Sequence, residues 1–198
     1  MKNFVSFVTV AVATLPSAAF AQDGFYAGAV AGYDHVVLSD GTDSGSKDGL
    51  VYGINAGYDA TLGSVVAGVE GEVTGSTVKE SETDVFTAGD TLTARAGRDF
   101  YVGARLGVAV TPATLAYVKG GYTNARLTIA YTSGTTAISA SDNLDGYRIG
   151  AGVEQSFGRF AGRLEYRYSD YSEIKAGGVS TGVDAKRHQV IVSLLTKF

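Results

Sequence analysis

Apolar and polar residues alternate along most of the chain with a period of two, which is the pattern of a half-buried β-strand. The first run places Phe25 and Tyr33 on one face and Asp34 on the other. Seven further runs alternate in the same way, and no stretch has the spacing of an amphipathic helix of useful length. We therefore expect an all-β chain of eight strands. The runs cover about residues 25–34, 52–59, 65–74, 102–110, 115–131, 147–157, 163–168 and 189–198.

The segments that connect these runs alternate between long and short. Consecutive antiparallel strands place their connections at alternate ends of a sheet. The sequence therefore predicts long loops at one end and short turns at the other. The long connections are residues 39–49, 75–97, 132–145 and 172–186, and the short ones are residues 61–64, 111–114 and 157–160.

The polar face of the runs distinguishes a soluble barrel from an inverted barrel whose apolar face contacts lipid. The polar face carries charged residues separated by glycine, whereas the apolar face carries many small residues and has aromatic rings near the strand ends. Lipid conforms to small side chains, but a soluble core needs side-chain volume to reach native packing density. An even strand number with long loops at one end is typical of outer-membrane barrels. The charged positions are Glu70, Glu72, Arg105, Lys119, Arg148, Glu154, Arg163, Glu165 and Arg167.

A membrane also demands closure, because an open sheet edge in hydrocarbon leaves backbone groups unpaired. We expect the last run to pair with the first, giving an eight-stranded antiparallel transmembrane β-barrel with four long extracellular loops and three short periplasmic turns. Phe198 is then expected at the periplasmic interface as an aromatic anchor. The run 115–131 is irregular, since Asn124 and Arg126 fall on its apolar face. This indicates either a bulge or a strand that has left the membrane.

The front of the chain has the layout of a secretory signal peptide. Lys2 is followed by a short apolar stretch and an A-x-A cleavage site at Ala19 and Ala21. The predicted organisation is a signal peptide over 1–21 and a barrel over 22–198, exported to the cell outer membrane. The chain has no cysteine, so no disulfide stabilises the exported domain. Its formal net charge of −4 argues against a nucleic-acid partner.

Several stretches carry a family resemblance: FYAGAVAGYD (25–34), YGINAGYDATLGSVVAGVEGEV (52–73), VGARLGVAVTPATLAYVKGGYTNA (102–125), GYRIGAGVEQSF (146–157), GRLEYRYSDY (162–171) and VIVSLLTKF (190–198). They resemble the small outer-membrane β-barrel proteins of OmpA-like and Opa-like type, often labelled porin-family or surface-antigen proteins and abundant in α-proteobacteria. The resemblance implies that the terminal strand is the signal read by the outer-membrane assembly machinery. That signal consists of Phe198 with Val190, Val192 and Leu194 on the same face.

The charged polar face is the first candidate site. An eight-stranded barrel has an interior just wide enough for side chains to fill, and a buried unpaired charge is costly. We therefore expect the four glutamates to pair with the arginines and the lysine and to plug the lumen. The alternative is a salt-bridge network that rearranges to open a narrow ion path.

Catalysis and metal binding have weaker candidates. His35 and His188 lie near the long-loop end of strands expected to be neighbours, where a lipid-modifying hydrolase or acyltransferase would need a serine nucleophile. Ser39 is near His35 but in a loop, and Val190 stands two residues after His188, so we expect interfacial hydrogen bonds instead. No cofactor or metal site is expected, since no cluster of His and carboxylate side chains has ligand spacing. The acidic residues of the long loops are expected to be solvated, and the alternative is that they bridge Ca²⁺ or Mg²⁺ to lipopolysaccharide. These acidic residues are Asp40, Asp43, Asp48, Glu80, Glu82, Asp84 and Asp90.

The sequence thus predicts a monomeric barrel that contacts outer-membrane lipids and lipopolysaccharide and is not an enzyme. The expected function is a structural or surface role in the envelope of a Gram-negative bacterium, with exposed loops that bind external partners. The alternative function is a narrow porin that conducts ions or small solutes through the barrel interior.

Overall fold

The computed structural model describes residues 23–39, 44–172, 175–176, 179–180 and 184–198. The predicted signal peptide, with Ala19 and Ala21, lies outside these residues. No helix in the described part of the chain is long and apolar enough to span a membrane. The described residues form eight long strands: β1 (Gly24–Ser39), β2 (Ser44–Leu62), β3 (Val65–Ser76), β5 (Thr91–Thr111), β6 (Thr114–Ser133), β7 (Thr136–Phe157), β8 (Phe160–Tyr171) and β11 (Asp184–Lys197).

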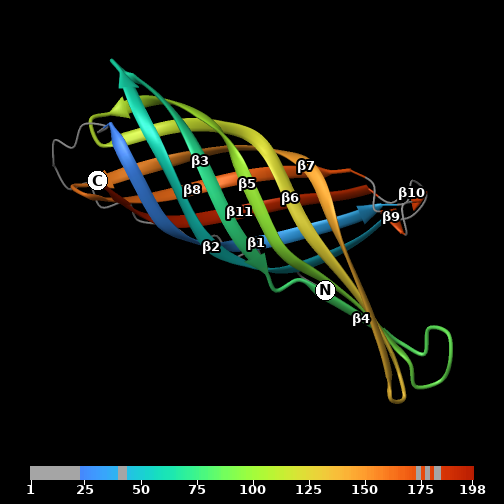
Figure 1. Ribbon diagram of the computed structural model, residues 1–198. Coiled ribbons are helices and arrows are strands. Elements are labelled where there is room, and N and C mark those ends of the chain that lie inside the picture. Colours follow the sequence, from blue (N-terminus) through green and yellow to red (C-terminus); the bar gives the residue numbers. More distant parts are fainter. Residues whose placement is uncertain (1–22, 40–43, 173–174, 177–178, 181–183) are drawn as a thin grey trace, which may run out of the picture.

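The eight long strands form one closed antiparallel barrel (Figure 1). Neighbours in the chain are neighbours in the ring, β3 pairs with β5, and β1 pairs with β11. The closing pair runs from Tyr26 opposite Lys197 to Ser39 opposite Asp184. The prediction that the last strand pairs with the first is confirmed, and within the described residues every long strand has two strand neighbours.

Side chains alternate across the barrel wall in the opposite sense to a soluble barrel. In β8, Arg163, Glu165 and Arg167 are buried, whereas Leu164 and Tyr166 between them are about half exposed. Strand geometry enforces this division, because successive Cβ atoms point to opposite faces of a sheet. The outside is therefore an apolar belt suited to lipid, and the inside is polar and closed off from solvent.

The three predicted short turns are each two residues long, at positions 63–64, 112–113 and 158–159. Gly63 and Gly158 have φ values of +67° and +68°. This left-handed region is open to glycine because glycine has no Cβ to clash with the backbone. These positions therefore allow tight reversals between paired strands.

The predicted long connections at the other end are largely strand, and the predicted loop 132–145 is wrong. Only residues 134–135 separate β6 from β7, and Gly134 has a φ of +56°. The two strands continue together beyond the rest of the barrel wall (Figure 1). Small polar and apolar residues are mixed on both faces of this hairpin. Its sequence therefore resembles a loop, although the backbone is fully paired.

The other long connections also contain strands. Strand β2 begins at Ser44, inside the predicted loop 39–49. Strand β4 (Lys79–Thr83) pairs with β5 inside the predicted loop 75–97. Two short strands, β9 (Lys175–Ala176) and β10 (Val179–Ser180), pair with each other in the last connection.

The run 115–131 is irregular because its outer face becomes polar, and not because β6 itself contains a bulge: Asn124 keeps the outward phase of Tyr122, and both side chains donate to Asp145. A β-bulge does lie opposite this part of β6, in β5. The register of β5 against β6 shifts between Ala96 and Asp99, so that Gly97 and Arg98 together oppose Arg126. On one side of this shift β5 pairs with β3, and on the other it pairs with β4. The bulge therefore lies at the boundary between the barrel wall and the hairpins that project beyond it.

The tip between β4 and β5 is held by one carboxylate. Asp90 accepts hydrogen bonds from the backbone N–H groups of Val85, Phe86 and Thr87 at 2.7–3.0 Å, and from the Tyr131 hydroxyl at 3.0 Å. Burial raises the pKa of Asp90, but these hydrogen bonds outweigh burial and hold the pKa below its usual value. The ring of Phe86 contacts that of Tyr131 edge to face at 5.8 Å, so the tip is fastened to β6.

We predict that Gly121→Ala destabilises the barrel, whereas Gly120→Ala does not. A Cβ at Gly121 would overlap the carbonyl oxygen of Val102 and the Cα of Gly103 on the adjacent strand. At Gly120 the nearest atom would be 3.8 Å away. Urea unfolding of protein in lipid vesicles should show a loss of about 1–3 kcal/mol for Gly121→Ala, the usual penalty of overpacking. Equal stability of the two variants would contradict this account of the close strand contact.

Candidate functional site: the interior of the barrel

The nine charged residues singled out in the sequence are all buried inside the barrel. They come from β3, β5, β6, β7 and β8, so their side chains converge from much of the ring. Each is at most 5 % exposed. The residues are Glu70, Glu72, Arg105, Lys119, Arg148, Glu154, Arg163, Glu165 and Arg167.

The interior also holds charged residues that were not in the predicted set. Asp34 and Asp59 lie on the polar faces of their own runs, so the alternation carried a signal for both. Arg187 shares its face with Gln189, and Asp99 lies four residues before Gly103 on the same side of β5. Extending the runs by two residues at a time would have found both. All four side chains are buried.

Glu70 is the centre of one cluster of the network. Its carboxylate accepts a hydrogen bond from the Tyr26 hydroxyl at 2.7 Å and lies 2.8 Å from the Lys119 ammonium group. Arg163 also pairs with it. Lys119 in turn lies 2.9 Å from Glu165. Four strands, β1, β3, β6 and β8, are thereby linked across the lumen.

The Glu154 carboxylate, next to the Glu70 cluster, contacts three cations. Arg105 and Arg163 each place a guanidinium nitrogen 3.0 Å from its Oε2, and the Lys197 ammonium lies 2.6 Å from its Oε1. Arg105 also lies 3.3 Å from Asp59. The terminal strand therefore contributes a charge to the network through Lys197.

Asp99 is the centre of a second cluster. Its Oδ2 accepts hydrogen bonds from Arg148 at 2.6 Å, from Arg187 at 2.9 Å and from the Tyr171 hydroxyl at 2.6 Å, while the Thr123 hydroxyl donates to Oδ1 at 2.8 Å. Four donors on one carboxylate balance its loss of hydration.

Asp34 connects the Asp99 cluster to β1 and β11, the two strands whose pairing closes the barrel. Arg187 donates to its Oδ1 from Nε at 2.7 Å and to its Oδ2 from Nη2, a two-pronged geometry that favours arginine over lysine. Gln189 donates to the same carboxylate at 2.9 Å. Asp34 belongs to β1, while Arg187 and Gln189 belong to β11, so this contact spans the seam at which the barrel closes.

Glu72 joins the two clusters into one network. Its Oε1 lies 3.3 Å from Arg148 and also pairs with Arg167, and its Oε2 lies 3.8 Å from Lys119. Among the described residues of the lumen, which exclude Asp90 at the β4–β5 tip, seven buried carboxylates face six buried cations and the nearly buried Lys197. The lumen is therefore close to electroneutral, which is the condition under which charges can be retained in a low-dielectric interior.

Tyrosine rings fill the space between the charged groups. The Tyr117 ring lies 4.8 Å from the Arg105 guanidinium and 5.1 Å from that of Arg163, and the Tyr101 ring lies 4.8 Å from the Lys119 ammonium. Cations over aromatic faces are attracted by the ring quadrupole. The rings thus stabilise the cations and occupy volume that water would otherwise take.

Two apolar clusters complete the filling. Leu195 packs with Tyr26 and Ala161, and Ile191 packs with Val30 and Val51. Ile191 and Leu195 are the two residues that interrupt the polar face of the last run, and the structure shows the reason: each fills an apolar contact inside the lumen.

The predicted assembly residues lie on the outside of the terminal strand. Val190 and Val192 are 46 % and 60 % exposed, and Leu194 and Phe198 are 63 % and 73 % exposed. They share the outer face at the end of the chain, which is apolar except for Thr196 between Leu194 and Phe198.

The two histidines lie side by side on the outer surface. His35 and His188 are directly opposite in the pairing of β1 with β11, with ring centroids 6.3 Å apart. His35 Nδ1 lies 2.6 Å from Asp48, which also accepts a hydrogen bond from the Tyr33 hydroxyl, and His188 Nδ1 lies 2.8 Å from the Tyr166 hydroxyl. No group of three or more His, Asp or Glu side chains in the described part of the chain is arranged to hold a metal ion.

Outward-facing tyrosines near the same end bond to aspartates. The Tyr168 and Tyr147 hydroxyls donate to Asp170 at 2.9 and 3.3 Å, and Tyr122 donates to Asp145. The chain has no tryptophan, so tyrosine supplies the amphipathic rings that mark the edge of a lipid-facing belt.

A closed antiparallel barrel with an apolar exterior and a paired, charged interior defines an integral membrane β-barrel. The sequence comparison agrees: the chain belongs to the outer membrane protein beta-barrel domain family, which matches residues 5–194. The protein is accordingly a component of the bacterial outer membrane. No curated protein matches the sequence.

Two solved structures show the same fold. Neisserial surface protein A is 17% identical with a TM-score of 0.55, and the match covers 88% of this chain and 97% of that one. Ail, the attachment invasion locus protein of Yersinia pestis, is 14% identical with a TM-score of 0.50, and the match covers 87% of this chain and 99% of that one. At these identities the likeness concerns architecture alone.

We predict that Glu70→Gln destabilises the barrel far more than Glu80→Gln. Both glutamates lie 2.8 Å from a lysine ammonium, Lys119 and Lys47 respectively, but only the first pair is buried. Removing one partner of a buried pair leaves an uncompensated charge and costs about 3–5 kcal/mol. The partly exposed Lys47–Glu80 pair is hydrated, so its loss should be small. Urea unfolding in vesicles measures both, and similar losses would show that burial of the network is not what stabilises it.

Proposed function

We propose that the protein is a structural, surface-presenting barrel of the outer membrane with a closed lumen. The observation that carries this proposal is the interior network, in which Glu70, Glu72, Asp99 and Glu154 each contact two or more cations from different strands. A conducting lumen would need these charges to separate, and each separated charge would have to regain hydration within a narrow space.

The surface role rests on the projecting hairpins. They expose apolar side chains that neither the barrel wall nor the lumen uses: Phe86 is 73 % exposed, Ile138 is 64 % exposed and Ile129 is 41 % exposed. Exposed apolar groups rimmed by polar residues mark interaction surfaces. We propose that these hairpins contact external partners, which agrees with the adhesive and surface names of Ail and neisserial surface protein A.

The remaining expectations are part of the same proposal. The apolar belt contacts outer-membrane lipids and lipopolysaccharide, and the outer face of β11, ending in Phe198, is the segment that the assembly machinery reads. The barrel works as a monomer. It is not an enzyme, and the hydrogen bonds of His35 to Asp48 and of His188 to Tyr166 support an interfacial role for the histidines.

The test of the closed lumen is ion conductance in a planar bilayer. Only refolded protein whose gel mobility shifts on boiling is used, because a folded barrel shows that shift. We predict that the natural protein is electrically silent. The double variant Glu72→Ala with Arg148→Ala removes an ion pair from the network and should give discrete conductance steps, which shows that the assay detects an open lumen.

Reproducible conductance steps from the natural protein would overturn the closed-lumen proposal and favour a narrow porin. A matched double variant on the exposed pair, Lys47→Ala with Glu80→Ala, controls for charge removal as such. It should be as silent as the natural protein, since this pair is partly exposed and takes no part in the interior network.

A further inference from the structure

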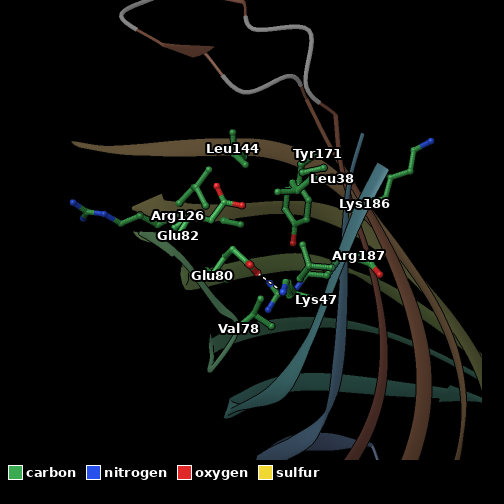
Figure 2. Close-up of a pocket in the computed structure, with 18 residues that line it drawn as sticks. Leu38, Lys47, Val78, Glu80, Glu82, Arg126, Leu144, Tyr171, Lys186 and Arg187 are labelled. Atoms are coloured by element: carbon green, nitrogen blue, oxygen red, sulfur yellow. Dashed lines mark ion pairs between the residues drawn. The ribbon is translucent and has the colours of Figure 1, made fainter. Parts of the chain in front are cut away.

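A cavity of about 340 Å³ lies at the hairpin end of the barrel, beyond the ion-pair network (Figure 2). It is bounded by residues of β1, β2, β4, β5, β6, β7, β8 and β11, so nearly the whole ring contributes to it. The volume is at the lower end of the range for small-molecule sites, about 300–1,000 Å³. The space suits a single short chain or a small ring system, and it is too small for a phospholipid with two acyl chains.

The lining of the cavity is mostly hydrocarbon. Val36, Leu38, Val78, Leu127 and Leu144 supply much of it, together with alanines from the surrounding strands. Leu144 also belongs to a buried cluster against which Leu127 packs. Unlike the lumen below it, this cavity is therefore apolar.

The two polar residues of the floor direct their polar atoms away from the cavity. The Tyr171 hydroxyl donates to Asp99 at 2.6 Å, and Arg187 donates to Asp34 at 2.7 Å and to Asp99 at 2.9 Å. These contacts lie in the ion-pair network, so these donors are directed away from the cavity. The floor accordingly presents the ring of Tyr171 and the carbon stem of Arg187.

The charges at the rim direct no unpaired cation into the cavity that could bind an anionic head group. Lys47 is paired with Glu80 at 2.8 Å, as the dashed line in Figure 2 marks. The side chains of Arg126 and Lys186 extend away from the cavity in opposite directions. Glu82 is exposed and therefore hydrated. As a carboxylate it repels an anion, and water and the neighbouring Lys47 weaken its attraction for a cation.

From this lining and rim we infer that the cavity binds one small, uncharged, lipophilic molecule of the size of a ten-carbon alcohol. The driving force is release of water from apolar walls. The hydrocarbon part lies against the leucines and valines, and a neutral hydroxyl faces the rim. The same chemistry has two sources, a free solute or the tail of a membrane lipid, and we assign the site to the free solute because it opens at the end from which the hairpins project beyond the barrel.

The absence of tryptophan from the chain allows a single reporter to be introduced. Leu38→Trp places the reporter in the cavity wall, and Val192→Trp places it on the lipid-facing belt. The protein is reconstituted in dimyristoylphosphatidylcholine vesicles, and 10-bromodecanol is added as the quencher. We expect saturable quenching at position 38 that excess decanol reverses, and linear, unsaturable quenching at position 192 from partition into the bilayer.

A second substitution fills the cavity. Ala94→Phe adds a ring to the cavity lining, whereas Ala104→Phe adds the same ring to the outer face of the same strand. In the Leu38→Trp background, Ala94→Phe should weaken bromodecanol binding at least about tenfold, and Ala104→Phe should leave it unchanged. Heat-shifted gel mobility verifies folding of every variant.

Three results would overturn the inference. Linear quenching at position 38, or unchanged binding in the Ala94→Phe variant, would show that the cavity does not bind the probe. Displacement of bromodecanol by decanoate or by decyltrimethylammonium as effectively as by decanol would show that the head group need not be neutral. Quenching at position 38 by a brominated-chain phosphatidylcholine alone would assign the site to a lipid tail instead of a free solute.

Discussion

The constraint on which the rest of the structure depends is closure of the sheet. In hydrocarbon, an unpaired backbone N–H or C=O group has no water to bond to, so the first and last strands must meet. The pairing of β1 with β11 meets this need along the whole of the described seam, from Tyr26 opposite Lys197 to Ser39 opposite Asp184. Eight strands closed in this way leave an interior that side chains can fill but that is too narrow for a wide aqueous channel.

Closure in turn determines the chemistry of the interior. Because the apolar residues face lipid, the inward positions are left to polar and charged side chains, and these can be buried only if each charge finds a partner. The protein meets this requirement with nearly equal numbers of carboxylates and cations, with tyrosine rings between them, and with two small apolar clusters around Ile191 and Leu195. The barrel is therefore stabilised from inside by electrostatic complementarity, where a soluble barrel relies on hydrophobic packing.

Much of this architecture could be predicted from alternation alone, because a period of two fixes the face of every residue once one is known. The eight strands, the places of the three short turns and the inward positions of residues such as Glu70 and Arg163 follow from that rule. Prediction failed where the two faces of a strand do not differ in polarity, or where the alternation changes phase within a strand. Over most of the β6–β7 hairpin both faces are solvated, so Thr132 to Asp145 resembled a loop. In β5, the extra residue of the bulge shifts the phase of the pattern between Ala96 and Asp99.

The individual contacts inside the lumen were beyond sequence reasoning for a different reason. Alternation places Asp34 and Arg187 on the inside, but it does not say that they meet, because that depends on the register of strands at opposite ends of the chain. The apolar cavity above the network was also missed. Its lining comes from one to three residues of nearly every strand, and only the closed ring brings Val36, Val78 and Leu144 around one space.

The contact between Asp34 and Arg187 has a consequence for the order of folding. These partners are 153 residues apart in sequence, and neither can neutralise the other until β1 and β11 are adjacent. A partly closed sheet would therefore carry unpaired charges on the face that is about to become the lumen, next to lipid that cannot solvate them. Charge neutralisation and closure are thus a single event, and a half-inserted barrel is penalised in favour of either the unfolded chain or the completed ring.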